Sequence, residues 1–545
     1  MKPQKTHILI SLCLLFSNIN AQSTYDLVYN LFQTNCAGYC HSGGSASGGL
    51  DLMGTGSDPK SDVWNNLYDA TPTNSYASGQ GYKRIFPGDP YRSMLFRKIN
   101  HDMDDFVSLH SNEGDPMPSL ELKDRDKELI RQWILFNSPE TGNVVDTALI
   151  GQYYDGFGVD GINTRPAPPA SGEGFQIKLG PYFLYANEEK EYYYKYHLKN
   201  SDTIEVNELY SDLGQTYSHH LIIFRFLNGE SGIDEGFRDD NAHYNVDMVT
   251  AHQQTENIAL PEGTGFQWTP NTVLDLNTHY INYSSSNVLK CENYINIYTQ
   301  EKNTALHHMQ TGLYPNISIF IPNDGNDYTF TKEEYDTSPD NVYIWSMSSH
   351  THQWGRDYDI WHRNPDGSKG AKIYDASNMD GDPNGVSVGF DYQHPPTRRW
   401  DYPFLSAPIN EGFIHEAVFN NTGSNAVYWG PTSNDEMMIM GLMYLEDTTG
   451  LANYSQTSLE IERGLKPKNL NLYPNPNNGN FIIDITNSNE LDFILTDISG
   501  KTLYSTKIKG NLKTPMFLGN LTKGLYIYEL KDNETSLKKG KLIVQ

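Results

Sequence analysis

Cysteine, basic residues and long apolar runs are all scarce in this sequence, and each scarcity excludes a class of protein. The 545 residues include only four cysteines, too few for a scaffold of this size held together by disulfides. Lys and Arg number 40 against 67 Asp and Glu, and a net charge of −27 argues against a nucleic acid or an anionic membrane as partner. The hydrophobic fraction is 37%, but aromatics reach 12% and include 37 Tyr, so we expect folded, strand-rich domains rather than disorder. At about 150 residues per domain, the length predicts three or four domains.

The one long apolar run lies at the N-terminus and is typical of a secretory signal peptide. Two lysines precede the apolar residues 8–16, and Ala21 offers a small residue for cleavage. The run is too short to span a bilayer. We therefore predict that residues 1–21 are a signal peptide, that the protein is exported through the periplasm, and that the mature chain has no transmembrane segment.

The other end of the chain, residues 471–545, is predicted to form a small β-sandwich. Short alternating runs are separated by turn residues, as in 480–485 and 524–530. Tyr-Pro-Asn-Pro at 473–476, the turn at 497–501 and the Gly-Leu-Tyr strand at 524–526 make this module resemble the type A sorting domain of the type IX secretion system of Bacteroidetes. The resemblance implies the type IX secretion machinery as a partner and a secreted or cell-surface location.

The first chemistry appears where Cys36 and Cys40 directly precede His41. Thiols can add to the vinyl groups of haem, and the adjacent imidazole can then reach the iron as an axial ligand. The spacing C-x-x-x-C-H is one residue longer than the common C-x-x-C-H. The alternative interpretation is a disulfide between the two cysteines beside an unrelated histidine.

A thioether between two prolines, Met117, is the candidate for the sixth ligand of that haem, because it is a soft ligand on a stiff loop. The other methionines in the region are Met53, Met94 and Met103. Apolar stripes predict helices around residues 27–32 and 129–134. With its Gly-Gly-Leu, Met-Pro and Arg-Gln-Trp-Ile segments, the region resembles c-type cytochrome domains fused to large secreted proteins. This resemblance implies a small all-α cytochrome c-like head over residues 22–140 that carries haem c and passes single electrons.

Beyond residues 141–175, which are rich in Pro, Gly and Asn and are predicted to be a linker, the sequence is strand-like to about residue 450. Its length suggests two packed β-sandwiches rather than one. Thirteen of the 17 histidines fall within this region, an excess that favours metal binding, since imidazole is the commonest protein ligand for copper and zinc.

Three histidine clusters lie on expected strands: His219 with His220, His279 alone, and His350 with His352. Side chains two apart in a strand share a face, so His350 and His352 can bind one ion together. The adjacent pair, His219 and His220, would do so only at a bulge or at a strand end. A methionine-rich segment at 435–443 adds a thioether, and two imidazoles with a thioether favour Cu(I).

The order His-His, His-Tyr, His-Thr-His, Asp-Glu-Met resembles the type II copper monooxygenases, the family of peptidylglycine α-hydroxylating and dopamine β-monooxygenase. The resemblance implies two β-sandwiches, here 176–305 and 306–450, that each bind one of two copper ions and face a solvent-filled cleft. By matching motifs, one set of residues would hold the electron-transfer copper: His219, His220 and His279. A second set would hold the oxygen-binding copper: His350, His352 and Met437.

Several residues stay outside these two predicted sites or replace residues of the family. Met438 and Met440 are reserves for the thioether ligand. Peptide-acting members carry an Arg, an Asn and a Tyr at positions where this chain has other residues, which argues against a peptidylglycine substrate: Ser348, Ile439 and Gly441. The remaining histidines are expected to be structural or superficial, among them His243, His252, His307, His308, His394 and His415. Cys291 has no second cysteine within the copper region.

Together these predictions describe a multidomain protein with a linker at 451–470 before the sorting domain. The expected function is a secreted copper-dependent monooxygenase that hydroxylates a C–H bond with dioxygen, while the haem head feeds electrons to the coppers. The organic substrate and the electron donor are not identified. The alternatives are a non-enzymatic surface haem and copper electron-transfer protein, and a surface-binding protein that kept the sandwiches without metal.

Overall fold

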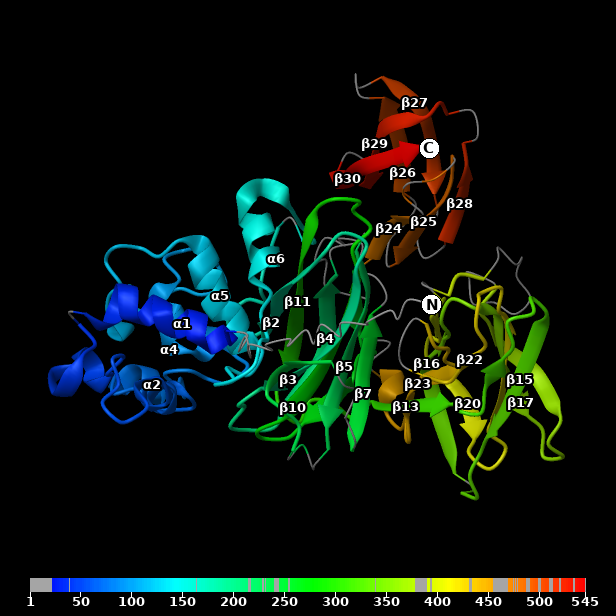
Figure 1. The fold of residues 1–545 in the computed structure, drawn as a ribbon. Helices are drawn as coiled ribbons and strands as arrows, with labels where there is room; N and C mark the ends of the chain where they lie inside the picture. The colour runs from blue at the N-terminus through cyan, green and yellow to red at the C-terminus, as the bar shows by residue number, and fades with distance from the viewer. Residues whose placement is uncertain are drawn as a thin grey trace, which may run out of the picture. The chain divides into compact units, whose positions relative to one another are not determined.

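A computed structural model of the chain describes most residues between 22 and 544 (Figure 1). Its elements separate into two units, the first comprising residues up to 156 with 235–237 and the second comprising the rest. Within 22–544, the residues that are not described are 39, 163, 214–216, 228–229, 231, 240–244, 253–254, 339, 378–389, 393–394, 431–433, 454–468, 474, 476, 478, 487–490, 498–500, 509–512, 519–520 and 533–534. The predicted signal peptide and most of the predicted linker at 451–470 therefore lie outside the described residues.

The first unit contains the α-helices of the described chain. They are α1 (Thr24–Phe32), α2 (Pro59–Leu67), α3 (Ser75–Gly79), α4 (Met94–Ile99), α5 (Asp124–Leu135) and α6 (Thr147–Gln152). Ser23 and Asp26 form a capping box that starts α1. Tyr25 of α1 stacks on Trp133 of α5, with ring centroids 5.2 Å apart, so the two predicted apolar stripes meet in the core.

The two helices predicted from these stripes are confirmed, but the structure is less helical than the compact all-α head implied by the resemblance. Between α4 and α5 the chain is irregular apart from a short 3₁₀ turn at Ser111–Glu113. That stretch is rich in Asp and Ser, whose side chains compete with regular helical hydrogen bonding, and it contains two prolines. The structure thus shows a unit of few and short helices.

The segment predicted as a linker at 141–175 is partly folded, which corrects the sequence-based boundary. It contains α6, whose Leu149 and Ile150 are buried, and the strand β1 (Gly158–Asp160), which pairs in parallel with β11 (Val288–Gln300). The composition of the segment predicts turns, but α6 forms within it and buries its two apolar side chains, Leu149 and Ile150.

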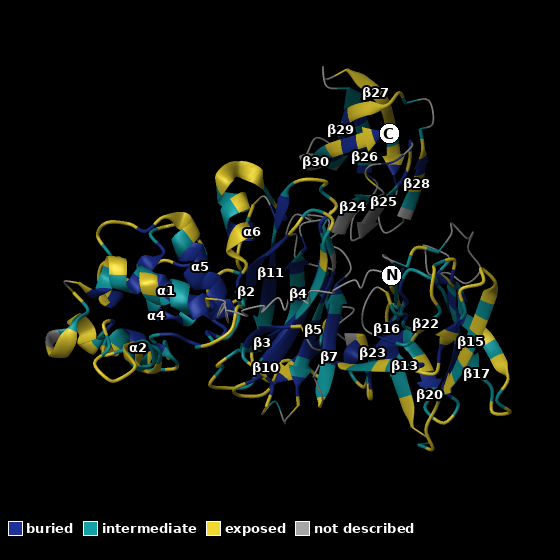
Figure 2. Cartoon of the chain, viewed as in Figure 1, coloured by how far each residue is buried: buried dark blue, intermediate teal, exposed yellow. Residues whose placement is uncertain are grey.

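Two sheets form the first β-sandwich. One sheet has the order β1-β11-β4-β9-β12, with β2 on β11 and β8 on β4, and the other has the order β6-β3-β10-β5-β7. The strands, with β1 and β11 given above, are β2 (Gly174–Leu184), β3 (Glu189–His197), β4 (Ile204–Asp212), β5 (Ser218–Phe226), β6 (Gly236–Arg238), β7 (Val246–His252), β8 (Glu256–Ala259), β9 (Thr264–Trp268), β10 (Val273–Ile281) and β12 (His307–His308). The core alternates along the strands, as Leu221 and Ile223 show, so the even-numbered residues of β5 point to the opposite face. Figure 2 shows this central set of strands as largely buried.

The second sandwich begins a few residues later than the predicted boundary at 305/306, because β12 pairs in parallel with β9 of the first sandwich. Its sheets have the orders β13-β23-β16-β19, with β20 on β16, and β15-β21-β17-β18, with a separate pair β14-β22. The strands are β13 (Gln310–Pro315), β14 (Phe320–Ile321), β15 (Asp327–Glu334), β16 (Asn341–His350), β17 (Gly355–Arg363), β18 (Lys369–Asp375), β19 (Arg398–Arg399), β20 (Leu405–Pro408), β21 (Phe413–Asn420), β22 (Val427–Tyr428) and β23 (Ile439–Leu445). Met347 of β16 and Phe419 of β21 share one apolar core, which joins the two sheets.

The C-terminal module is a third, smaller pair of sheets, as predicted. They have the orders β24-β25-β28 and β27-β26-β29-β30 around a core that includes Phe493 and Leu530. The strands are β24 (Asn469–Tyr473), β25 (Asn480–Thr486), β26 (Leu491–Asp497), β27 (Thr502–Ile508), β28 (Lys513–Phe517), β29 (Gly524–Asp532) and β30 (Thr535–Val544). The described chain is therefore multidomain and mostly β-sheet.

Candidate metal centres

The first histidine pair is assembled by neighbouring strands of one sheet. His220 of β5 and His279 of β10 are directly opposite each other in the antiparallel ladder, and their ring centroids lie 5.0 Å apart. Both side chains are buried and lie on the sheet face away from the sandwich core, since Leu221 and Thr278 occupy the core-facing positions next to them. Strand pairing, not proximity in sequence, therefore brings the two imidazoles together.

His219 is the extra residue of a β-bulge. The ladder runs from His279 opposite His220 to Tyr280 opposite Ser218, so His219 has no opposite residue. A bulge is the irregularity that the sequence required if His219 and His220 were to share one ion. The side chain of His219 lies outside the described residues, and its role as a ligand stays a prediction.

Carboxylate and amide oxygens lie within contact distance of the Nε2 atoms of His220 and His279. Nε2 of His279 lies 2.7 Å from Oε1 of Glu189. Nε2 of His220 lies 2.8 Å from Oδ1 of Asn277 and 3.4 Å from Oε1 of Glu191. Asn277 Nδ2 in turn donates to Glu191 Oε1 over 2.8 Å. Glu189 and Glu191, which lie two residues apart on β3, thus contact one histidine on β10 and one on β5.

This carboxylate support was missed by the sequence-based analysis. The signal was present, because Glu189 and Glu191 alternate on one face of a strand. What the sequence does not reveal is that β3 pairs with β10 in the register that sets Glu191 opposite His279. Although burial opposes it, the contacts of Glu191 with His220, His279 and Asn277 lower its pKa to about 2, so it is a carboxylate at any working pH.

The second pair comes from the end of one strand and the residues that follow it. His350 closes β16, His352 lies two residues on, and their ring centroids are 5.2 Å apart. Burial lowers the pKa of His352, so the ring is neutral near pH 7, the form that binds a metal. The pairing of these two rings agrees with the prediction from their spacing.

A buried carboxylate ties the methionine segment to this second pair. Glu436 is fully buried and accepts hydrogen bonds from the backbone N–H groups of His352, of Trp354 over 3.0 Å and of Met437 over 2.9 Å. His352 Nδ1 also lies 3.1 Å from the carbonyl oxygen of Asp435. Burial raises the pKa of Glu436 to about 7 against the opposing effect of these bonds. The contacts explain how Met437 comes to lie next to His352 although it is far away in sequence.

Met438 and Met440, the alternative thioether ligands predicted from the sequence, pack in the core instead. Met438 and Met440 are both 0% exposed and belong to the apolar core of the second sandwich, and Asn316 Nδ2 lies 3.5 Å from the Met438 sulfur. Met437 is half-buried and outside that core. Of the three thioethers, Met437 therefore remains the candidate ligand.

The two histidine pairs are adjacent. The rings of His220 and His350 have centroids 6.3 Å apart, so the order in space is His279, His220, His350, His352. The resemblance implied that a solvent-filled cleft separates the two sites, but this distance leaves no room for one between these rings. Four of the six predicted copper ligands therefore form one continuous row of imidazoles contributed by both sandwiches.

Four histidines outside this row, His252, His307, His308 and His415, contact polar groups of the protein. His415 Nδ1 lies 2.6 Å from the Tyr358 hydroxyl, His307 Nε2 lies 2.8 Å from the Thr449 carbonyl, and His252 Nε2 lies 3.0 Å from the Thr250 hydroxyl. His308 Nε2 lies 3.7 Å from a Glu205 carboxylate oxygen. His243 and His394 lie outside the described residues. Cys291 is a buried free thiol.

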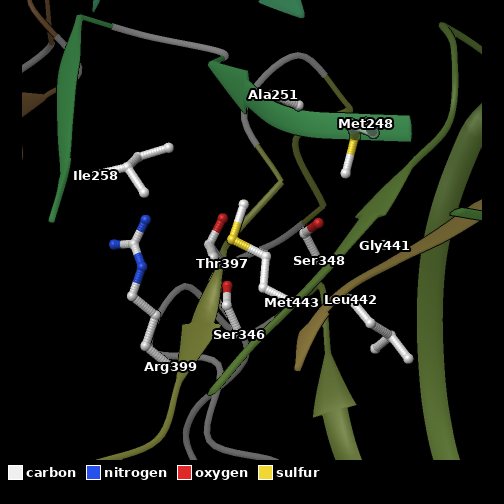
Figure 3. Close-up of a pocket in the computed structure, with 10 residues that line it drawn as sticks. All are labelled: Met248, Ala251, Ile258, Ser346, Ser348, Thr397, Arg399, Gly441, Leu442 and Met443. Carbon is white, nitrogen blue, oxygen red and sulfur yellow. The ribbon is translucent and has the colours of Figure 1, made fainter. Parts of the chain in front are cut away.

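A small cavity lies between β7 of the first sandwich and β16, β19 and β23 of the second (Figure 3). It is lined by Met248, Ala251, Ile258, Ser346, Ser348, Thr397, Arg399, Gly441, Leu442 and Met443. Ser348 precedes His350 by two residues on β16 and therefore shares its face of the sheet. Figure 3 shows the Met443 thioether pointing into the space and the Arg399 guanidinium at its side.

An acidic cluster on the second sandwich forms ion pairs with a lysine. Asp357, Asp359 and Asp375 have carboxylate oxygens within 4.8 Å of one another. Lys372 Nζ lies 2.9 Å from Asp359 and 3.2 Å from Asp375. The lysine supplies the positive charge that these carboxylates need.

In the first unit, the thiols of the predicted haem-binding motif are free. Among the described residues Cys36, Cys40 and Cys291 are unbridged, so the alternative disulfide between Cys36 and Cys40 is not formed. Cys36 lies in a π-helical turn, Gln33–Ala37, which prolongs α1.

His41 is oriented by a backbone contact, since its Nδ1 lies 3.1 Å from the carbonyl oxygen of Leu50. A donated Nδ1–H bond would leave Nε2 as the coordinating nitrogen. Met117 is 40% exposed on a loop held by its own N–H, which donates to the Lys98 carbonyl over 2.8 Å. Of its competitors, Met94 is buried in the core and the Met103 sulfur lies 3.8 Å from the Tyr154 hydroxyl, while Met53 is exposed.

Comparison with known proteins assigns the C-terminal module. Residues 471–545 match the family described as the secretion system C-terminal sorting domain. This module is a type IX secretion sorting domain. The sorting domain makes the chain a secreted or cell-surface protein and a client of the type IX secretion machinery, which confirms the predicted location. No helix among the described residues is long and apolar enough to cross a membrane.

Other comparisons leave the remaining domains unassigned. No curated protein matches the chain. Solved structures with partial likeness include β-glucuronidase from Ruminococcus gnavus in complex with an N1-substituted uronic isofagomine, with 11% identity and a TM-score of 0.13 over 41% of this chain and 37% of that chain. The same enzyme with uronic isofagomine gives 9% identity and a TM-score of 0.13 over 45% of each chain. The match thus spans less than half of the glucuronidase, and a likeness this weak carries no argument about fold or activity.

Proposed function

We propose that the chain is an exported copper-dependent monooxygenase whose head carries haem c and supplies electrons to two copper ions. The observation that carries the proposal is the row of four imidazoles, His279, His220, His350 and His352, gathered from two sandwiches. The two end residues of this row are separated by 73 positions in sequence, so ordinary local packing does not explain it.

The donor set fits copper better than other common metals. Neutral imidazoles and a thioether are the ligands that copper prefers, whereas calcium and magnesium need several oxygen donors. His220 and His279, with His219 as the third predicted donor, would hold one ion. His350, His352 and Met437 would hold the other. Because Nε2 of His220 and of His279 is engaged by polar side chains, these rings would coordinate through Nδ1, and His352, held at Nδ1, would coordinate through Nε2.

The head fits haem c on the chemistry of its residues. Cys36 and Cys40 are available as thiols for two thioether links, and His41 is oriented by Leu50 to present Nε2. Burial raises the pKa of Cys36 to about 11, so this group is a neutral thiol, and Met117 on its exposed loop is the predicted sixth ligand. Haem bound here would exchange one electron at a time.

Hydroxylation of a C–H bond needs two electrons, and the two proposed copper ions could each store one. A C–H bond, one O₂, two electrons and two protons give an alcohol and one water. Copper bound at these sites supplies one-electron storage and dioxygen binding. The residues of the chain keep His220, His279 and His352 buried, and Ser346 and Ser348 of the same strand as His350 offer hydroxyl groups to the cavity.

The competing function is an electron relay without oxygen chemistry. It is favoured by the burial of His220, His279 and His352, which suits a closed redox centre. The half-buried Met437 favours the oxygenase, because a relay does not need access to its metal.

Rapid mixing of the reduced, copper- and haem-loaded full chain with dissolved oxygen tests the proposal. We expect haem oxidation to keep pace with copper oxidation in the wild type and to slow at least tenfold in His352→Ala. His308→Gln, a histidine that lies outside the row, is the matched control and should behave like the wild type. A screen of small organic compounds with ¹⁸O₂ should yield a product that carries one labelled oxygen. Equal haem oxidation rates in wild type and His352→Ala, with no labelled product, would refute the proposal.

A further inference from the structure

The sorting module ends in an edge strand, β30, and part of this edge is paired with the segment that contains the Tyr-Pro-Asn-Pro motif. β30 is the last strand in the order β27-β26-β29-β30, so one of its sides pairs with β29 and the other is the edge of the sheet. We propose that residues 475–477 form an edge cover, which keeps the module from pairing through β30 with a second copy of this chain. The inference gives a role to a motif that the metal centres do not use.

The side chain of Asn475 pairs with β30 as a peptide group would. Its Nδ2 donates to the carbonyl oxygen of Lys541 over 2.6 Å, and its Oδ1 accepts the N–H of Ile543 over 2.8 Å. In a parallel ladder, a residue forms these two hydrogen bonds with the neighbours of the residue opposite it. The amide of Asn475 therefore takes the place of a parallel strand opposite Leu542.

Asn477 continues the same register with its backbone. It forms a parallel bridge with Val544, and its N–H donates to the carbonyl oxygen of Ile543 over 2.9 Å. Its buried side chain accepts the N–H of Gly479 over 2.7 Å, which fixes the chain just before β25. Together with the two bonds of Asn475, this contact pairs three successive backbone groups at the end of β30.

The edge cover lies where the edge most needs it. An unpaired strand edge is a template for a strand of another chain, and charged side chains, lysine above all, oppose such pairing. The first part of β30 contains three lysines, at 538, 539 and 541, so two copies paired there would bring like charges together. The last part, residues 542–544, contains no charged residue, and this is the part with which the edge cover pairs.

The composition of the motif makes it a poor template for a further strand. Pro474 and Pro476 have no N–H and cannot donate to a ladder. A backbone strand of ordinary residues at this place would pair with β30 but would present a new edge of its own. The amide of Asn475 pairs with β30 without doing so, because a side chain does not continue the ladder outward.

Analytical ultracentrifugation of the full chain tests the edge cover. Asn475→Ala removes both side-chain bonds to β30, and we expect its self-association constant to exceed that of the wild type at least tenfold. Asn475→Asp keeps the acceptor for the Ile543 N–H but loses the donor to Lys541, so we expect a smaller increase. Added salt should strengthen the association of Asn475→Ala, because it screens the lysines of β30.

Ser505→Ala is the matched control, because Ser505 is an exposed polar residue of β27, the strand at the other end of the same sheet. It should associate no more than the wild type does. Hydrogen exchange in dilute, monomeric samples gives a second readout. The Ile543 amide should exchange at least tenfold faster in Asn475→Ala than in the wild type, with unchanged exchange at Leu530 in the core of the module.

Two results would overturn the inference. One is a wild-type self-association constant in both Asn475 variants. The other is an equal rise in Ser505→Ala, which would place the association outside the edge of β30.

Discussion

The two histidine pairs use the same residue type but are built in different ways. His220 and His279 face each other across a strand ladder and are supported by side-chain carboxylates and an amide. His350 and His352 lie two residues apart at the end of β16, and His352 is held by a backbone carbonyl and by Glu436. The imidazoles are the same in both pairs, so the pairs differ in the groups that contact them: carboxylates and an amide in the first pair, and a backbone carbonyl in the second.

The largest effect on stability is expected for Met438→Ala, because Met438 lies in the core and its neighbour Met437 does not. Met438→Ala opens a cavity in the core of the second sandwich and should lower the free energy of unfolding by about 2–5 kcal/mol. Met437→Ala should cost much less, since Met437 is half-buried and outside that core. Urea denaturation of the metal-free chain measures both, and retention of Cu(I) against a chelator should fall only for Met437→Ala. Similar Cu(I) loss for both variants would remove the distinction between ligand and core methionine.

A smaller effect is expected for the carboxylate that anchors the second pair. Glu436→Gln leaves one acceptor oxygen for three backbone N–H groups and buries an amide N–H₂, at a cost of about 1–3 kcal/mol. Glu189→Gln, whose side chain is 35% exposed, should change stability by less than about 1 kcal/mol. Urea midpoints of the two variants make the comparison. A larger loss for Glu189→Gln would mean that the first pair, not the second, depends on its carboxylate for folding.

The smallest effect near neutral pH should come from a histidine that belongs to neither pair. Burial, followed by the charge of Arg399, lowers the pKa of His252 to about 3 from its usual 6.5. The unfolded chain then binds a proton below pH 6.5 that the folded chain does not, so this contribution to stability is complete above pH 6.5 and falls with decreasing pH towards 3. Between pH 6.5 and 5.5 the loss is about 1 kcal/mol. His252→Gln should flatten the dependence of the urea midpoint on pH over this range; an unchanged dependence would contradict the assignment.

The sequence was sufficient for features that local pattern determines. The i, i+2 spacing of His350 and His352 predicted their shared face, and the alternation after residue 471 predicted the sorting module. The need for a bulge at His219 could also be stated in advance. Each of these depends on the backbone period of a single strand.

Features that depend on strand partners could not be predicted in this way. Nothing in the sequence near Glu189 indicates that β3 lies beside β10, or that His307 and His308 add a parallel strand to the first sandwich. The folded part of the predicted linker depends on a parallel pairing of β1 with β11, more than a hundred residues away. The adjacency of His220 and His350 likewise arises from how two sandwiches meet.

Copper content of the loaded and desalted full chain, measured by mass spectrometry, tests the central claim most directly. The account predicts two copper ions per chain in the wild type, one in His279→Ala, one in His352→Ala and none in the double variant. Less than one copper per wild-type chain, or the loss of all copper in either single variant, would contradict the claim that the two histidine pairs are two metal sites.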